Sequence, residues 1–262
     1  MKRRMPLLPH RRPALARVAE RQPLICALAL VAVWGGPIFA YAAFIEMDLD
    51  SALLYHGAMA AFVVLLLTWL GWWREAGFCR WRNPGLLILP AAMVVAYYRG
   101  VALSGVLTLT TFGLLALLIS FQEEAWHRGI ILRALVPAYG VKRAAAVGAV
   151  LFAAVHVVQM FHNASVGASL FRAVSAGILG YILTVVRLRT GSIWPGMLLT
   201  CLLQYVLLLG RGGLVNTGLL PMSPHQLGIK VLTTLVVFAW AVRTLRRLPT
   251  EPVLLPQSAQ AS

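Results

Sequence analysis

The chain has 262 residues, of which 60 % are hydrophobic and only 12 % are charged. Soluble domains carry about 25 % charged residues, so this composition excludes an ordinary soluble protein and indicates a membrane protein with several spans. The formal net charge is +15. Because the basic residues gather in short segments between apolar runs, as the positive-inside rule predicts, they do not indicate a nucleic-acid partner.

The N-terminal segment, residues 1–23, is polar and basic. We expect it to be a disordered cytoplasmic tail that touches anionic lipid. The first apolar run extends from Leu24 to Ile45. A signal peptide is the competing interpretation, since Ala40-Tyr41-Ala42 resembles an A-x-A cleavage site. The run is as long as a full membrane span, and we therefore expect an uncleaved first helix.

Seven further apolar runs predict membrane spans, and the turns between them contain Gly, Pro or charged residues, or, at 162–164, His and Asn. These runs extend over 52–73, 86–98, 101–136, 144–161, 165–186, 191–209 and 227–242. The sequence thus predicts an all-α bundle of about eight transmembrane helices over residues 24–248, with both termini cytoplasmic. We expect the polar tail, residues 249–262, to be disordered.

The three cysteines, Cys26, Cys79 and Cys201, lie in or beside apolar runs and show no CxxC spacing. We expect them to act as small hydrophobic residues, without a disulfide or a zinc ion.

Two adjacent carboxylates, Glu123 and Glu124, interrupt the fourth span. One charged side chain at the bilayer centre costs about 2.5–3.5 kcal/mol, so a chain that keeps two of them is usually using them. In a helix, Glu124 and Arg128 lie on one face and can pair, which leaves Glu123 without that partner. The pattern indicates one carboxylate held by a cation and one kept for chemistry. A solvated amphipathic turn at the membrane surface is the alternative.

Polar residues of three predicted spans reach comparable depths in the membrane. With a rise of about 1.5 Å per residue, Glu123 lies about 15 Å from the cytoplasmic end of its helix and His156 about 20 Å. Thr200 and Gln204 lie about 12–18 Å along the seventh span. A lone histidine on an apolar face is more often structural, but the matching depth predicts a shared polar cavity in which His156 is functional.

Three motifs follow one another along the chain: Glu123-Glu124-x-x-x-Arg128, Phe152-x-x-x-His156 and Gly191-Ser192-Ile193-Trp194-Pro195-Gly196-Met197. Together they resemble the motifs of the CPBP family, the CAAX-processing and bacteriocin-processing intramembrane proteases, over roughly residues 70–205. The third motif departs from the family pattern. Members usually carry H-x-x-x-N, or Asp in place of the Asn, after this lead-in, whereas this chain has Thr200 and Gln204.

The resemblance implies a glutamic-type intramembrane endopeptidase of a bacterial inner membrane. Glu123 and His156 would activate a water for attack on the peptide bond, and Glu124 with Arg128 would brace the first motif. Thr200 and Gln204 would hold the oxyanion, because a Thr hydroxyl and a Gln amide both donate hydrogen bonds. The substrate would be a membrane-tethered peptide or protein: a prenylated tail, a leader peptide or a C-terminal sorting anchor. The sequence does not choose among these.

No cofactor or metal is expected. Neither Thr nor Gln is a good zinc ligand, and Glu123 with His156 falls short of the three protein ligands that a catalytic zinc usually has. His127 and His162 are the side chains that could complete such a site, so a metalloprotease remains an alternative.

Two alternatives come from other functional classes. The altered third motif would fit a catalytically inactive relative that acts as a membrane scaffold or immunity protein. A small transporter could use Glu123 and Glu124 as proton sites, but the sequence has no internal repeat and no pair of Gly/Pro-broken helices.

Overall fold

The computed structural model describes residue 18 and residues 21–44, 48–98, 106–157, 166–211 and 223–248. Within these ranges every regular element is helical, which confirms the predicted fold class. Most of the predicted N-terminal tail, and from residue 249 the whole of the predicted C-terminal tail, lie outside the described residues.

The elements follow the predicted spans closely. In chain order they are α2 (Pro23–Phe44), α3 (Leu49–Leu70), α4 (Trp73–Ala76), the 3-10 helix η1 (Pro84–Leu87), α5 (Ile88–Tyr97), α6 (Val106–Glu124), η2 (Ala125–Ile131), α7 (Leu132–Val157), α8 (Val166–Thr190), α9 (Trp194–Arg211) and α10 (Pro224–Arg246).

Four helical stretches in the described part of the chain are long and apolar enough to cross a membrane: Leu49–Leu70, Val106–Val157, Ser169–Thr190 and Pro224–Arg246. Shorter apolar helices extend over Pro23–Pro37, Pro84–Tyr97 and Trp194–Gly210. The chain is therefore an integral membrane protein built as a polytopic helical bundle.

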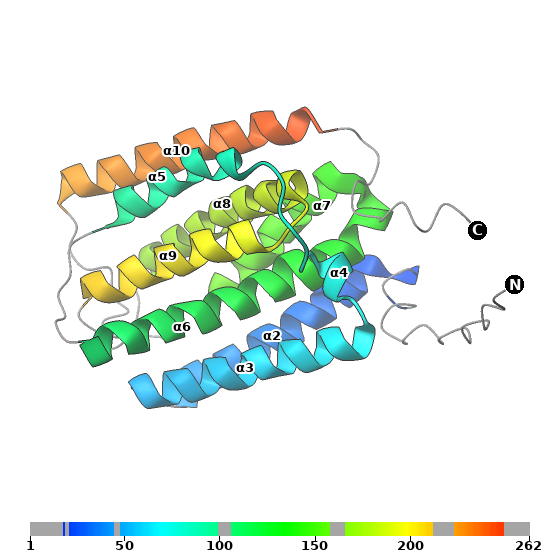
Figure 1. The fold of residues 1–262 in the computed structure, drawn as a ribbon, viewed down its shortest axis with the longest axis horizontal. Coiled ribbons are helices and arrows are strands. Elements are labelled where there is room, and N and C mark those ends of the chain that lie inside the picture. Colours follow the sequence, from blue (N-terminus) through cyan, green and yellow to red (C-terminus); the bar gives the residue numbers. More distant parts are fainter. Residues whose placement is uncertain are drawn as a thin grey trace, which may run out of the picture.

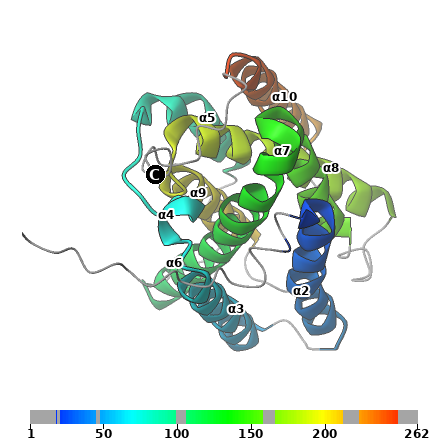
Figure 2. The ribbon, with the colours of Figure 1, turned by 90° about the vertical axis from the view of Figure 1, so that its right-hand side faces the viewer.

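The long helices run roughly parallel to one another, as Figure 1 shows from the side and Figure 2 from one end. Helix α6 packs against α3 and α9, and α7 packs against α2 and α8. Helix α5 lies against α9 and α10. The path α6–η2–α7 is therefore bordered by α2, α3, α8 and α9, which places the acidic pair at the end of α6 inside the bundle.

The predicted turn between the fourth and fifth spans takes the form of a sharp bend within α7. Gly140 has φ 70° and ψ 166°, which is outside the helical region, while the residues on both sides are helical. A left-handed φ is readily adopted by glycine because it has no Cβ. Pro137 lies just before the bend, so proline and glycine together redirect the chain where the sequence predicted.

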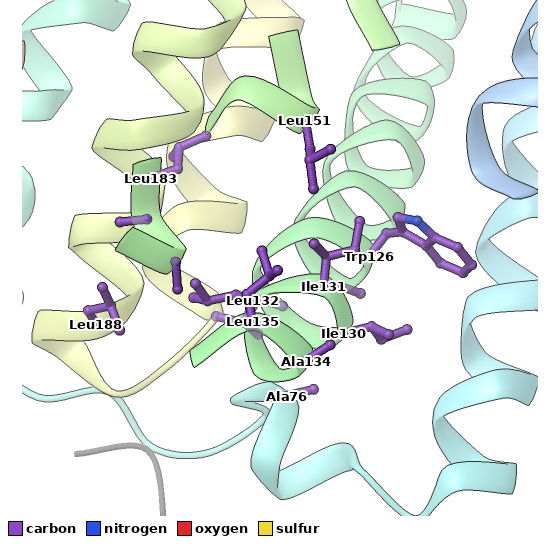
Figure 3. Close-up of a cluster of buried hydrophobic side chains, with 14 of the residues drawn as sticks. Ala76, Trp126, Ile130, Ile131, Leu132, Ala134, Leu135, Leu151, Leu183 and Leu188 are labelled. Carbon is purple, nitrogen blue, oxygen red and sulfur yellow. The ribbon is translucent and has the colours of Figure 1, made fainter. Parts of the chain in front are cut away.

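A cluster of buried apolar side chains surrounds the η2 segment (Figure 3). Trp126, Ile130 and Ile131 of η2 are fully buried, as is Leu135 of α7. Ala76 of α4 lies beneath this cluster in Figure 3, and Leu183 and Leu188 of α8 lie to its side. Close packing of this kind holds the segment that directly follows the acidic pair, because voids in a core are costly.

The connection between α3 and α5 is hydrogen-bonded to the turn between α8 and α9. The backbone N–H of Ile193 donates to the Gly77 carbonyl at 2.9 Å, and Ser192 Oγ donates to the Cys79 carbonyl at 2.7 Å. Cys79 Sγ donates in turn to the Gly191 carbonyl at 3.1 Å. These bonds fix the beginning of α9, the helix that carries Thr200.

Asp48 and Arg80 provide a test of the predicted membrane orientation. Both are exposed, and they flank α3, with Asp48 as its N-cap and Arg80 beyond α4. In a chain freed of its native cysteines, Asp48→Cys in intact cells should react with an impermeant thiol reagent and Arg80→Cys should not. The reverse labelling pattern would contradict the predicted orientation.

Candidate active site

The acidic pair lies where α6 changes from an α-helix to a π-helix. Glu124 is the last residue of α6, and Ala125–Ile131 form the π-helical element η2. The N–H of Leu132 donates to the carbonyl of His127, five residues earlier. A regular helix was expected here. Short π-helical segments are rare and frequently occur at functional sites.

This segment is buried in the protein interior. Glu124 is 0 %, Arg128 2 % and Glu123 9 % exposed. Gln122 and His127 are buried as well. The alternative of a solvated turn at the membrane surface is therefore wrong.

Glu124 is held by two partners. Arg128 Nη1 lies 3.1 Å from Glu124 Oε1, which is the pairing predicted from their spacing. Thr200 Oγ1 of α9 donates a hydrogen bond to the same oxygen at 3.4 Å. The structure thus joins the first motif to the third-motif position through Glu124, with the Thr200 hydroxyl hydrogen directed at the carboxylate.

Gly196 allows α9 to approach this carboxylate. A Cβ atom at position 196 would lie 2.5 Å from Glu124 Oε2, closer than real Cβ atoms come to other atoms. The close approach therefore requires glycine at this position of the Gly191–Met197 motif.

Phe152 connects the first motif to His156. Arg128 Cζ lies 4.3 Å from the centroid of the Phe152 ring, a distance at which a cation is attracted to an aromatic face. The rings of His156 and His127 both lie 4.7 Å from the same ring, centroid to centroid. The phenylalanine of the second motif is thus the common neighbour of Arg128 and two histidines.

The ring orientation of His156 is set by its own helix. His156 Nδ1 lies 2.9 Å from the Phe152 carbonyl oxygen. A carbonyl oxygen only accepts hydrogen bonds, so Nδ1 carries the proton in this contact. In the neutral imidazole Nε2 is then the nitrogen with a lone pair, available to accept a proton or a hydrogen bond.

For Glu123 and Gln204 the structure gives burial and position, but no hydrogen bond or ion pair within the described residues. No hydrogen bond or ion pair joins Glu123 to another residue in the described part of the chain, which distinguishes it from Glu124. Gln204 lies one turn beyond Thr200 on α9 and is half-buried. The roles assigned to Glu123, Glu124, His156, Thr200 and Gln204 remain predictions.

The other candidate metal ligands are also located. His127 is buried beside Phe152, and His162 lies outside the described residues. Among the described residues, no three His, Cys, Asp or Glu side chains gather closely enough to hold a metal ion.

A polar contact that the sequence did not predict lies on another side of α6. Gln122 is the residue directly before the acidic pair. Its amide nitrogen forms a hydrogen bond with Nδ1 of His56 in α3. A histidine within the apolar run 52–73 was the available signal for this contact. Trp34 of α2, whose ring meets His127 edge-on, gave no signal, because a tryptophan in an apolar run is ordinarily a packing residue.

Comparison with known protein families returned a match to the central part of the chain. Residues 105–206 match the model of a family described as Rce1-like, type II CAAX prenyl endopeptidase Rce1-like. No curated protein and no solved structure matches the chain. The matched segment contains all three motifs, and the match supports an intramembrane endopeptidase. The resemblance predicted from these motifs is thereby confirmed: residues 105–206 of this membrane protein are similar to the Rce1-like type II CAAX prenyl endopeptidases.

Proposed function

We propose that the chain is a glutamic-type intramembrane endopeptidase in which Glu123 activates a water for peptide-bond hydrolysis. The observation that carries the proposal is the inequality of the acidic pair. Glu124 is engaged by Arg128 and Thr200, whereas Glu123 is buried next to it without such a partner among the described residues. A buried carboxylate that has no cation of its own is suited to take a proton.

In the proposed reaction the water oxygen attacks the carbonyl carbon of the scissile bond while Glu123 accepts a proton from that water. When the carbon–nitrogen bond breaks, Glu123 passes this proton to the leaving nitrogen, which gives a carboxyl group and an amine. His156 supports the attack through Nε2, which is left free by the bond from Nδ1 to the Phe152 carbonyl and can hold the water by accepting a hydrogen bond from it. Thr200 and Gln204 are the proposed donors to the oxyanion.

The substrate class follows from the position of the site. Because the acidic pair is buried within a helical bundle of a membrane protein, the substrate must reach it from the bilayer as a membrane-tethered peptide or protein. The family description names CAAX prenyl endopeptidases, so a prenylated C-terminal tail is the first substrate to test. We propose that the protein lies in a bacterial inner membrane with both termini in the cytoplasm, and that it acts without a nucleic-acid partner.

The two carboxylates should respond differently to substitution. Glu123→Gln should give a folded protein whose turnover of a farnesylated CAAX peptide falls by about 10²- to 10⁴-fold, the contribution of a general base. Arg128→Ala leaves the Glu124 charge buried and unpaired, at a cost of about 3–5 kcal/mol, and should mainly lower the melting temperature. Fluorescent peptide cleavage and thermal unfolding in detergent measure both effects.

Asp50→Asn is a control for loss of a carboxylate, since Asp50 is exposed in the first turn of α3. It should retain both activity and stability. Equal thermal destabilisation by Glu123→Gln and Arg128→Ala would contradict the division of roles, as would cleavage that persists in Glu123→Gln.

Thr200 tests the altered third motif. If its hydroxyl serves the oxyanion, Thr200→Val should lower kcat by about 10²-fold with little change in stability, and Thr200→Ser should retain activity. If the hydroxyl only braces Glu124, as its 3.4 Å contact permits, Thr200→Val should lower stability by about 0.5–1.5 kcal/mol and leave kcat nearly unchanged. An inert wild type together with an active Thr200→His variant would instead favour a catalytically inactive relative.

A chelator provides the test for metal dependence. Because no metal takes part in the proposed reaction, incubation with EDTA or 1,10-phenanthroline should leave the cleavage rate and the melting temperature unchanged. A loss of activity that added Zn²⁺ restores would contradict the glutamic mechanism and favour the metalloprotease alternative.

A further inference from the structure

Trp34 and His127 bring buried polar groups together from two different helices. Trp34 lies in α2 and His127 in η2, and their rings meet edge-on, with centroids 4.9 Å apart and planes at 90°. Trp34 is 2 % and His127 5 % exposed. Trp34 lies outside the three sequence motifs and His127 occupies a variable position of the first, and the proposed reaction uses neither of them.

The nitrogens of these rings have no hydrogen-bond partners among the described residues. Trp34 Nε1 and both ring nitrogens of His127 are buried and make no hydrogen bond within the described part of the chain. An indole N–H can only donate, while a neutral imidazole offers one donor and one acceptor. Buried polar groups are nearly always satisfied, so three unpartnered nitrogens side by side point to a polar ligand at this place.

The position of His127 links these nitrogens to the reacting groups. Glu124 and Arg128, four residues apart, are in contact, so residues four apart in this stretch share a face. His127 follows Glu123 by the same spacing and therefore lies on the face of Glu123. The His127 ring also contacts Phe152, and the Phe152 ring in turn contacts His156. Trp34 lies eleven residues into α2, about 16 Å along it, close to the depth expected for Glu123.

We infer that Trp34 and His127 form a substrate subsite that hydrogen-bonds a peptide group beside the scissile bond. A peptide group supplies a carbonyl oxygen for the Trp34 N–H, and the chain on either side of it supplies the acceptor and the donor that His127 needs. A prenyl chain has no such groups, so the subsite takes the peptide portion of the substrate. This inference rests on the proposed function and identifies residues that hold its substrate.

Binding can be measured separately from turnover. In the Glu123→Gln background, a farnesylated CAAX peptide is titrated and its Kd compared with that of the same protein carrying Trp34→Phe, which keeps an aromatic ring and removes the N–H. The loss of one hydrogen bond should raise Kd by about 2- to 10-fold.

Trp126→Phe is the matched control. Trp126 is fully buried and its Nε1 is also without a partner among the described residues, but its ring lies against Phe62 of α3, with centroids 5.8 Å apart. The Trp126→Phe variant should therefore leave Kd unchanged. An equal rise in Kd for the Trp34 and Trp126 variants would indicate a general packing effect and overturn the inference.

Two variants of His127 distinguish a role in binding from a role in packing. Its surroundings are aromatic, with Trp34 on one side and Phe152 on the other, so a purely structural role would favour His127→Phe over His127→Asn in every measurement. A subsite predicts opposite rankings. His127→Phe should be the more thermally stable variant, because it removes unsatisfied buried nitrogens. His127→Asn, which keeps a donor and an acceptor, should bind the peptide several-fold more tightly.

The two hypotheses fail in distinguishable ways. If wild type cuts the peptide and the Trp34 and His127 variants bind it as tightly as the parent, the subsite is refuted while the proposed function stands. If wild type does not cut the peptide, yet Glu123→Gln binds it through Trp34 and His127, the proposed function fails and the subsite stands. Absence of both cleavage and binding overturns both.

Discussion

Glu124 and Arg128 are almost fully removed from solvent, and their side chains meet at 3.1 Å. Removing charges from water is costly, so such a pair persists only where good geometry and further polar contacts compensate. The rest of the site is arranged around that requirement. Thr200 adds a hydrogen bond to the carboxylate, and the Phe152 ring lies against the guanidinium.

The same pair determines which helices can surround it. Helix α9 must come close enough for Thr200 to reach Glu124, and only a glycine at position 196 leaves room for the carboxylate. The beginning of α9 is fixed in turn by hydrogen bonds from its preceding turn to Gly77 and Cys79. A loop far from the acidic pair along the sequence therefore contributes to the geometry of the pair.

Much of this organisation could be predicted from the sequence. Apolar runs between basic turns predicted the helical spans, and the spacing of Glu124 and Arg128 predicted their ion pair, because both depend on local periodicity. The bend at Gly140 followed from the proline and glycine there. The π-helix could not be predicted, since no residue type marks it. The contact between His56 and Gln122 and the meeting of Trp34 with His127 depend on helix packing, which a single sequence does not encode locally.

The π-helical turn also affects how the chain tolerates changes in length. A π-helix accommodates one more residue per turn than an α-helix would, so deleting a single residue within 125–131 would permit an ordinary α-helix there. Because the deleted residue is the extra one that the π turn accommodates, the helices on both sides would keep roughly their present length and orientation, and the chain could still cross the membrane. The side chains between the deletion and the end of the former π turn would instead change their positions relative to Glu123 and Glu124. A change in length here would therefore leave membrane insertion intact while it alters the surroundings of the acidic pair.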